Sequence, residues 1–166
     1  AGGRFMRGRH QKSRRTQSKR SSGWGEYLTP VLALLGLGVA GYLAYVETQA
    51  VSAICGPVGD CNTVQSSPYA RLFGVLHIGV LGVVGYILIL AAWMWKRLRS
   101  DRLAMYASLA IFGMAFFGTL FSLYLTYLEP FVIRAVCAWC LASAVLITLL
   151  MLVNVTPALQ SAKIKK

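Results

Sequence analysis

The sequence predicts an all-α integral membrane protein, a bundle of four transmembrane helices with a short half-helix in the first external loop. Hydrophobic residues make up 57% of the 166 residues and charged residues only 13%, which is too apolar for an ordinary soluble domain. The apolar residues gather in four runs, each long enough to cross a membrane as a helix. The charged residues gather in both tails and in one connecting loop.

The chain begins with a basic segment, residues 1–22, which contains eight Lys or Arg and no acidic residue. This composition predicts a disordered tail, although an Arg- and Ser-rich start is also typical of the remnant of a transit peptide. The first span is expected at residues 27–46. Its small residues Gly36, Gly38 and Gly41 would permit close approach of a neighbouring helix.

The first connection, residues 47–71, carries two cysteines. Cys55 and Cys61 flank a segment rich in Gly and Pro, which predicts a bendable turn. Polar residues before Pro68 predict the short half-helix at the membrane surface. The other three spans are expected at residues 72–95, 103–128 and 131–153. The predicted regions are therefore a basic tail at 1–22, a four-helix membrane domain at 23–155 and a second basic tail at 156–166.

The distribution of Lys and Arg predicts which way the bundle faces, because these residues favour the cytoplasmic side. Eight precede the first span, four lie at residues 96–102 and three lie in the C-terminal tail. The other two connections carry only Arg71 and Arg134. Both termini are therefore expected on the cytoplasmic side of a bacterial inner membrane, or on the stromal side of a plastid thylakoid membrane. The net charge of +12 is interpreted as topology signals and contacts with anionic lipid rather than nucleic-acid binding.

All four cysteines would then share the opposite, periplasmic or lumenal side, where disulfides form and persist. Cys137 and Cys140 form a Cys-X-X-Cys pair at the N-terminal end of the last span, where exposed N–H groups favour a thiolate. Four cysteines allow three sets of pairings. A relay would use Cys55–Cys61 and Cys137–Cys140 as resting or end states and Cys61–Cys137 as the transfer intermediate.

Two other interpretations of the cysteines are static disulfides and a four-thiolate zinc site. Static disulfides are less favoured, because a Cys-X-X-Cys bond within one helix constrains almost no chain. A zinc site half inside the bilayer would be poorly placed. No haem, flavin or nucleotide motif is present, so the expected electron acceptor is a lipid-soluble quinone beside Cys140.

The order of these features resembles the vitamin K epoxide reductase family, including its bacterial and plastid homologues, over about residues 23–153. The matching residues are Cys55, Cys61 to Ala70 with its Ser66-Ser67-Pro68, Phe73-Gly74, and Cys137-Ala-Trp-Cys140. The resemblance implies that Cys55 exchanges with a partner, Cys61 passes electrons to Cys137, and Cys140 faces the quinone. The quinone would be ubiquinone, menaquinone, plastoquinone or phylloquinone. Because no thioredoxin-like domain is fused to this chain, the partner would be a separate thioredoxin-like protein.

Six residues are candidates for quinone binding. Ser67 is a candidate through the family match and is otherwise a helix cap. His77 is an ionisable group inside the predicted second span, where such groups are often functional, although a hydrogen-bonded structural histidine is the plainer interpretation. The remaining candidates are aromatic, with core packing as the alternative role: Phe73, Phe117, Phe121 and Tyr124.

Two departures from the animal enzymes argue against vitamin K epoxide as the main substrate. Ala144 replaces a tyrosine, and the second span has His77 but no early asparagine. The expected activity is thus a quinone-dependent thiol oxidoreductase that supports disulfide bond formation. Vitamin K epoxide or quinone reduction is one alternative, and a non-enzymatic four-span scaffold is another. A disulfide generator of the bacterial periplasmic type is disfavoured, because that family has the two cysteine pairs in reverse order.

Overall fold

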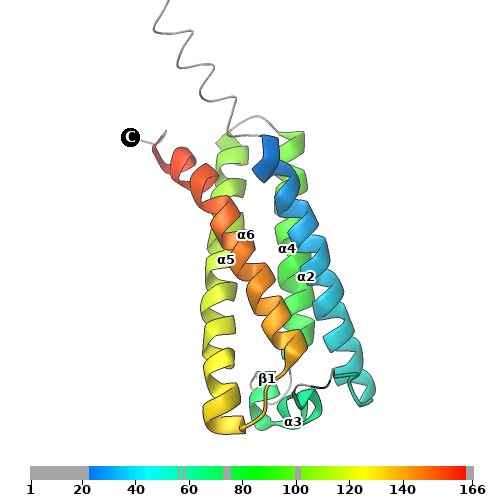
Figure 1. Ribbon diagram of the computed structural model, residues 1–166. Helices are drawn as coiled ribbons and strands as arrows, with labels where there is room; N and C mark the ends of the chain where they lie inside the picture. The colour runs from blue at the N-terminus through cyan, green and yellow to red at the C-terminus, as the bar shows by residue number, and fades with distance from the viewer. Residues whose placement is uncertain (1–22, 56, 58, 73–75, 100–101, 164–166) are drawn as a thin grey trace, which may run out of the picture.

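Four long helices form the body of the protein (Figure 1). The computed structural model describes residues 23–55, 57, 59–72, 76–99 and 102–163, so the predicted tail at 1–22 lies outside the described residues. All four helices are long and apolar enough to cross a membrane. They are α2 (Gly23–Gln49), α4 (Ile78–Leu98), α5 (Arg102–Leu128) and α6 (Ala138–Lys163). The prediction of an all-α, four-helix membrane bundle is confirmed.

The short elements gather at the end of the bundle away from the C-terminus (Figure 1). Helix α3 is the half-helix expected in the first loop. The hairpin of β1 and β2 is antiparallel, with Arg71 opposite His77. The short elements are α3 (Cys61–Ser66), the 3-10 helix η1 (Pro68–Ala70), β1 (Arg71–Leu72), β2 (Leu76–His77) and the π-helix η2 (Glu129–Ile133).

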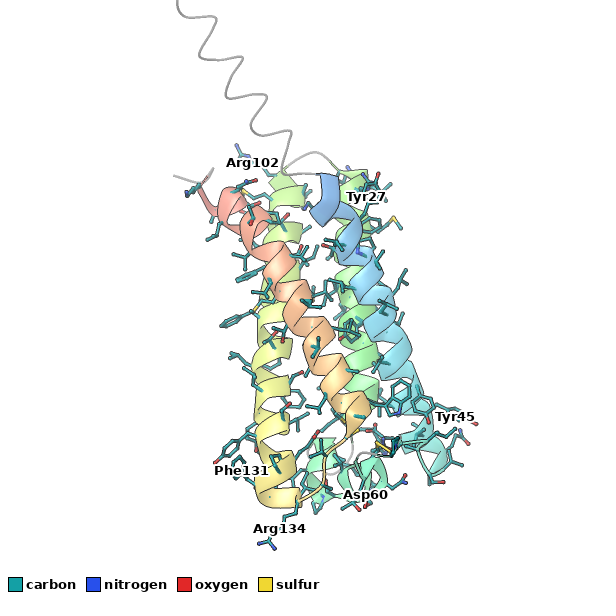
Figure 2. All side chains as sticks on the ribbon, viewed as in Figure 1. Tyr27, Tyr45, Asp60, Arg102, Phe131 and Arg134 are labelled. Carbon is teal, nitrogen blue, oxygen red and sulfur yellow. A yellow bond between two sulfur atoms is a disulfide. The ribbon has the colours of Figure 1, made fainter. Side chains whose placement is uncertain are left out.

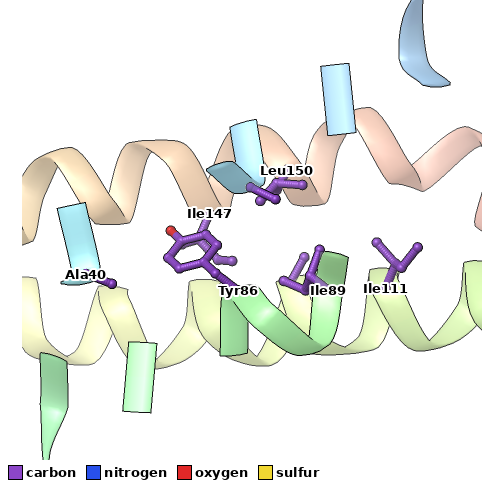
Figure 3. Close-up of a cluster of buried hydrophobic side chains, with 8 residues drawn as sticks. Ala40, Tyr86, Ile89, Ile111, Ile147 and Leu150 are labelled. Carbon is purple, nitrogen blue, oxygen red and sulfur yellow. The ribbon is translucent and has the colours of Figure 1, made fainter. Parts of the chain in front are cut away.

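The helices pack in a ring, in which α2 contacts α4 and α6, and α5 also contacts α4 and α6. The connections from α4 to α5 and from α5 to α6 are short, so these helices run antiparallel to each other in sequence. Buried side chains from all four helices meet at the centre (Figure 3). Large apolar side chains point outward instead, with Leu34 57% exposed and Leu152 58% exposed. A bilayer provides the apolar solvent that such a surface requires.

The three glycines that were expected to permit helix packing have different surroundings in the structure. A Cβ atom at Gly36 would overlap the ring of Tyr86, whereas Gly38 and Gly41 face open space. A close contact with the backbone of α2 occurs at Gly79, where an added Cβ would lie 2.6 Å from the backbone nitrogen of Ala44. The packing of α2 against α4 therefore also depends on Gly79, which the spacing of small residues did not indicate.

Two predicted positions are corrected. The fourth helix was expected from residue 131, but α6 begins at Ala138. The chain after α5 instead forms a π-turn containing Pro130, and then Arg134 adopts a left-handed conformation with φ 58°. His77 was expected inside the second span, but it lies in β2 and precedes α4. The β1–β2 hairpin uses the residues that would have formed the first turns of that span.

Candidate active site

The first cysteine pair forms a disulfide at the N-terminus of α3. Cys55 and Cys61 are bonded, with their Cα atoms 6.0 Å apart. Asp60 caps α3 by accepting a hydrogen bond from the backbone N–H of Thr63 at 3.2 Å and another from the Thr63 hydroxyl at 2.5 Å. These bonds hold the pKa of the Asp60 carboxyl below its ordinary value. Cys61 therefore begins a short, capped helix, and the disulfide ties Cys55 to it.

This loop is attached to the beginning of α6. The backbone N–H of Asp60 donates to the Val136 carbonyl at 3.1 Å, and the indole N–H of Trp139 donates to the Ile54 carbonyl at 3.0 Å. Gly59 has a φ of 112°, and a side chain there would collide with the Val136 carbonyl oxygen. The ring of Trp139 also lies 4.8 Å from that of Tyr42. These contacts place the two cysteine pairs at the same end of the bundle.

The second pair consists of free thiols. Cys137 is completely buried and immediately precedes α6. Its carbonyl accepts from the backbone N–H of Leu141 at 3.0 Å, and its sulfur accepts from the backbone N–H of Cys140 at 3.3 Å. A side chain that accepts in this way acts as a helix N-cap. Hydrogen bonding from the Cys140 thiol lowers the pKa of Cys137 and outweighs the opposing effect of burial, so Cys137 is the thiol better suited to carry negative charge.

Glu129 supports Cys137 from the preceding turn. Its side chain is only 2% exposed, and its Oε2 accepts the backbone N–H of Cys137 at 3.1 Å. The carbonyl of Glu129 also accepts from Ala135 N–H at 3.1 Å, which closes the turn. A carboxyl group buried in a membrane protein is costly and is often functional. Here it also holds the backbone on which the second cysteine pair is presented.

A cavity of about 310 Å³ opens between the four helices next to Cys140. Its walls are mostly apolar and come from α2, α4, α5 and α6, and the polar side chains that border it include those of Glu47, Glu129 and Gln65 of α3. One of these, the side-chain amide nitrogen of Gln65, is buried and has no hydrogen-bond partner within the described part of the chain. An apolar pocket with a few convergent polar groups is typical of a small-molecule site. Apolar walls, a spare donor and an adjacent thiol fit a quinone with carbonyl oxygens.

The candidate quinone residues fall into three groups. Ser67, Phe117 and Phe121 line this cavity, although the Ser67 hydroxyl donates to the Val64 carbonyl at 2.6 Å. His77 and Tyr124 are not among the residues that form its described lining. Phe73 lies outside the described residues. For all six, the assigned binding role stays a prediction.

Sequence reasoning missed several polar residues of the cavity. Gln65 lies four residues after Cys61 in the same short helix, a spacing that puts two side chains on one face. Glu129 was not proposed as a site residue, although a carboxyl at the end of an apolar run is a recognisable signal. Glu47, the first residue of the predicted connection 47–71, was not proposed as a site residue either. It lines the cavity and accepts the backbone N–H of Gly79 at 2.9 Å.

The pairing of the four cysteines and the arrangement of possible metal ligands bear on the static-disulfide and zinc interpretations. Cys55 and Cys61 share a disulfide, while Cys137 and Cys140 share none. Within the described residues, no group of three or more His, Cys, Asp or Glu side chains is arranged to hold a metal ion.

The comparison with known proteins covers most of the chain. The model of the vitamin K epoxide reductase family matches residues 27–155. The chain belongs to this family. It is therefore a multi-pass membrane oxidoreductase, and the enzymes of the vitamin K epoxide reductase family are quinone-linked. The match extends from α2 into α6 and includes both cysteine pairs and the cavity.

Proposed function

We propose that this family member oxidises a separate thioredoxin-like protein and passes the electrons to a membrane quinone, thereby supporting disulfide bond formation. One observation carries the proposal. Cys61 and Cys137 are both fully buried and pack in the same cluster, and Cys140 borders the apolar cavity. The sulfurs thus form a continuous series from an accessible loop to a space inside the bundle.

The first exchange takes place at Cys55. A thiolate of the partner attacks the Cys55 sulfur, the Cys55–Cys61 bond breaks, and Cys61 leaves as a thiolate. The second thiol of the partner then attacks the mixed disulfide, which leaves the partner oxidised and Cys55 reduced. Cys55 is the accessible member of the pair, because it is partly exposed whereas Cys61 is completely buried.

The second exchange transfers the disulfide between the pairs. The Cys61 thiolate attacks Cys137 of an oxidised Cys137–Cys140 pair, and Cys140 leaves as a thiolate. Cys55 then attacks Cys61, which restores the loop disulfide and releases Cys137. The observed state, with the loop pair oxidised and the helix pair reduced, corresponds to the end of this exchange.

The last step restores the helix pair. Cys137 and Cys140 form a disulfide with loss of two electrons and two protons, and a bound quinone is a suitable two-electron, two-proton acceptor. The cap interaction at Cys137 keeps its sulfur beside Cys140. The Glu129 carboxyl accepts the backbone N–H of Cys137 and so ties the start of the cysteine pair to η2. The apolar walls would hold the quinone ring and keep water from the thiols.

The orientation in the membrane is part of this proposal. We propose that both termini lie on the cytoplasmic or stromal side and that the cysteines face the periplasm or thylakoid lumen. In Figure 2, Arg102 lies at the end of the bundle opposite Asp60. The basic loop before α5 and the cysteine loop therefore occupy opposite ends, which supports the orientation predicted by the positive-inside rule.

The deciding experiment is reduction of a short-chain quinone by the purified protein, driven by a reduced thioredoxin-like protein. Cys140→Ser should abolish quinone reduction. Without Cys140 no Cys137–Cys140 disulfide can form, so Cys61 has no oxidised pair to attack. Cys55→Ser should instead stop oxidation of the partner protein. Because Cys55 is the thiol that releases Cys137, this variant should accumulate a Cys61–Cys137 mixed disulfide, which can be identified by peptide mass under non-reducing conditions. Unchanged turnover in Cys140→Ser would overturn the proposed function.

A further inference from the structure

We propose that Gln65 is a specificity-determining residue of the cavity, whose side-chain amide donates a hydrogen bond to a carbonyl oxygen of the bound acceptor. This inference rests on the proposed function and names one contact that would select the acceptor. The starting observation is the buried Gln65 Nε2, which has no hydrogen-bond partner among the described residues. A buried donor without a partner is unfavourable, so such a group calls for an acceptor.

The position of Gln65 connects it to the redox site. It lies in α3, which begins at Cys61, and it borders the same cavity as Cys140. Helix α3 is held at its start by the loop disulfide and by the Asp60 cap. The amide is thus carried by a fixed element and opens on the cavity that the reactive thiol also borders.

Four other polar side chains that line the cavity already have partners. The Ser67 hydroxyl donates to the Val64 carbonyl, and the Tyr86 hydroxyl lies 3.4 Å from both Ser143 oxygens. The two carboxylates accept backbone N–H groups, Glu47 from Gly79 and Glu129 from Cys137. Gln65 therefore differs from these four, because within the described part of the chain its amide N–H donor has no partner.

This distribution indicates the chemistry of the occupant. Carboxylate oxygens would repel an anionic head group, and the apolar walls suit a ring and a hydrocarbon tail. A ring carbonyl accepts a hydrogen bond but carries no net charge. It can therefore bind the amide N–H of Gln65 without electrostatic repulsion from the two carboxylates. A ring of the same size that lacks carbonyl oxygens would leave the amide unpaired.

The test compares Gln65→Leu with the unaltered protein, both in a Cys140→Ser background that prevents turnover. The probes are a short-chain alkyl benzoquinone and an alkylbenzene with the same tail, and binding is measured by titration calorimetry in detergent. Loss of one buried hydrogen bond should weaken benzoquinone binding by about tenfold and leave alkylbenzene binding unchanged or tighter. Gln49→Leu, the same substitution at an exposed residue at the end of α2, is the matched control and should change neither affinity.

A second measurement separates hydrogen bonding from a structural effect. The infrared C=O stretch of the bound benzoquinone, labelled with carbon-13, should lie at lower frequency in the unaltered protein than in Gln65→Leu. Gln65→Glu keeps the shape of the side chain but replaces the amide donor with a carboxyl group. Because an ionised carboxylate only accepts hydrogen bonds, this variant should also weaken benzoquinone binding.

The inference would be overturned if Gln65→Leu weakened binding of both probes equally, or if the carbonyl frequency were the same in Gln65→Leu as in the unaltered protein. If Gln65→Leu bound benzoquinone as tightly as the unaltered protein while quinone reduction still required Cys140, the inference alone would fail. If the unaltered protein bound no benzoquinone and reduced none, the proposed function would fail with it.

Discussion

Gly79 is the position at which the packing of α2 against α4 can be tested most directly. A Cβ atom added there would lie 2.6 Å from the Ala44 backbone nitrogen, 2.9 Å from the Ala44 Cα and 2.7 Å from the Glu47 Oε2. Two of these atoms belong to the backbone of α2, so they cannot move aside as a flexible side chain would. Gly79→Ala must therefore separate the helices or displace the Glu47 carboxylate.

The cost can be worked from these contacts. Overpacking in a well-packed interior costs about 1–3 kcal/mol, and loss of a hydrogen bond to a charged acceptor costs about 1.5–3 kcal/mol. The higher helix propensity of alanine returns about 1 kcal/mol at most. Because the two costs overlap in one displacement, the expected net loss is about 2 kcal/mol, which lowers the melting temperature by about 5 °C for a chain of this size.

The assay is thermal unfolding in one detergent, followed by circular dichroism. Gly38→Ala is the matched control, because it lies on the same pair of packed helices but no described residue has an atom within 4 Å of its added Cβ. That variant should melt at the original temperature or slightly above it. If Gly79→Ala and Gly38→Ala melted alike, the close approach of the two helices would be refuted.

Three further predictions concern the cysteine end. Cys140→Ala removes the thiol that lowers the pKa of Cys137, so the thiolate absorbance of Cys137 should appear at higher pH in a titration, and an unmoved titration would contradict this assignment. The pKa of Asp60 is depressed by the α3 cap, so its stabilisation is complete above the ordinary Asp pKa and is lost as the pH falls through the depressed value. Reduction of the loop disulfide by an acid-tolerant phosphine should therefore accelerate over that range, and Asp60→Asn should remove this cap-dependent part of the pH response. Trp139→Phe loses the bond to the Ile54 carbonyl but keeps an aromatic ring, so a soluble thiol should reduce the loop disulfide about tenfold faster through easier local opening. An unchanged rate would show that this bond does not restrain the loop.

The fourth helix illustrates where sequence reasoning reached its limit. The length of the apolar run correctly predicts a membrane-spanning helix, because a bilayer demands a minimum length of apolar residues. It does not locate the start of α6, because residues 131–137 are also mostly apolar. The π-turn, the left-handed Arg134 and the Glu129 hydrogen bond to Cys137 decide that start, and they depend on residues that are packed together only in the folded bundle.

The glycines and His77 show the same limit at single residues. Spacing alone treats Gly36, Gly38 and Gly41 as equivalent, but only the contacts of each with a second helix distinguish them. His77 was assigned to the second span because its neighbours are apolar, and pairing of β2 with β1 places it before α4. Hydrogen bonding between strands outweighed the local apolar pattern there.

The sequence by itself determined the class of the fold, the number of spans and the grouping of the four cysteines, because hydropathy and charge act on each segment independently of its neighbours. Only the tertiary structure decided which sulfur is buried against which, that Cys140 borders a cavity, and that a glutamine amide there has no partner among the described residues. Those properties depend on side chains from separate helices and the first loop meeting at one place, and no local pattern along the chain specifies that meeting.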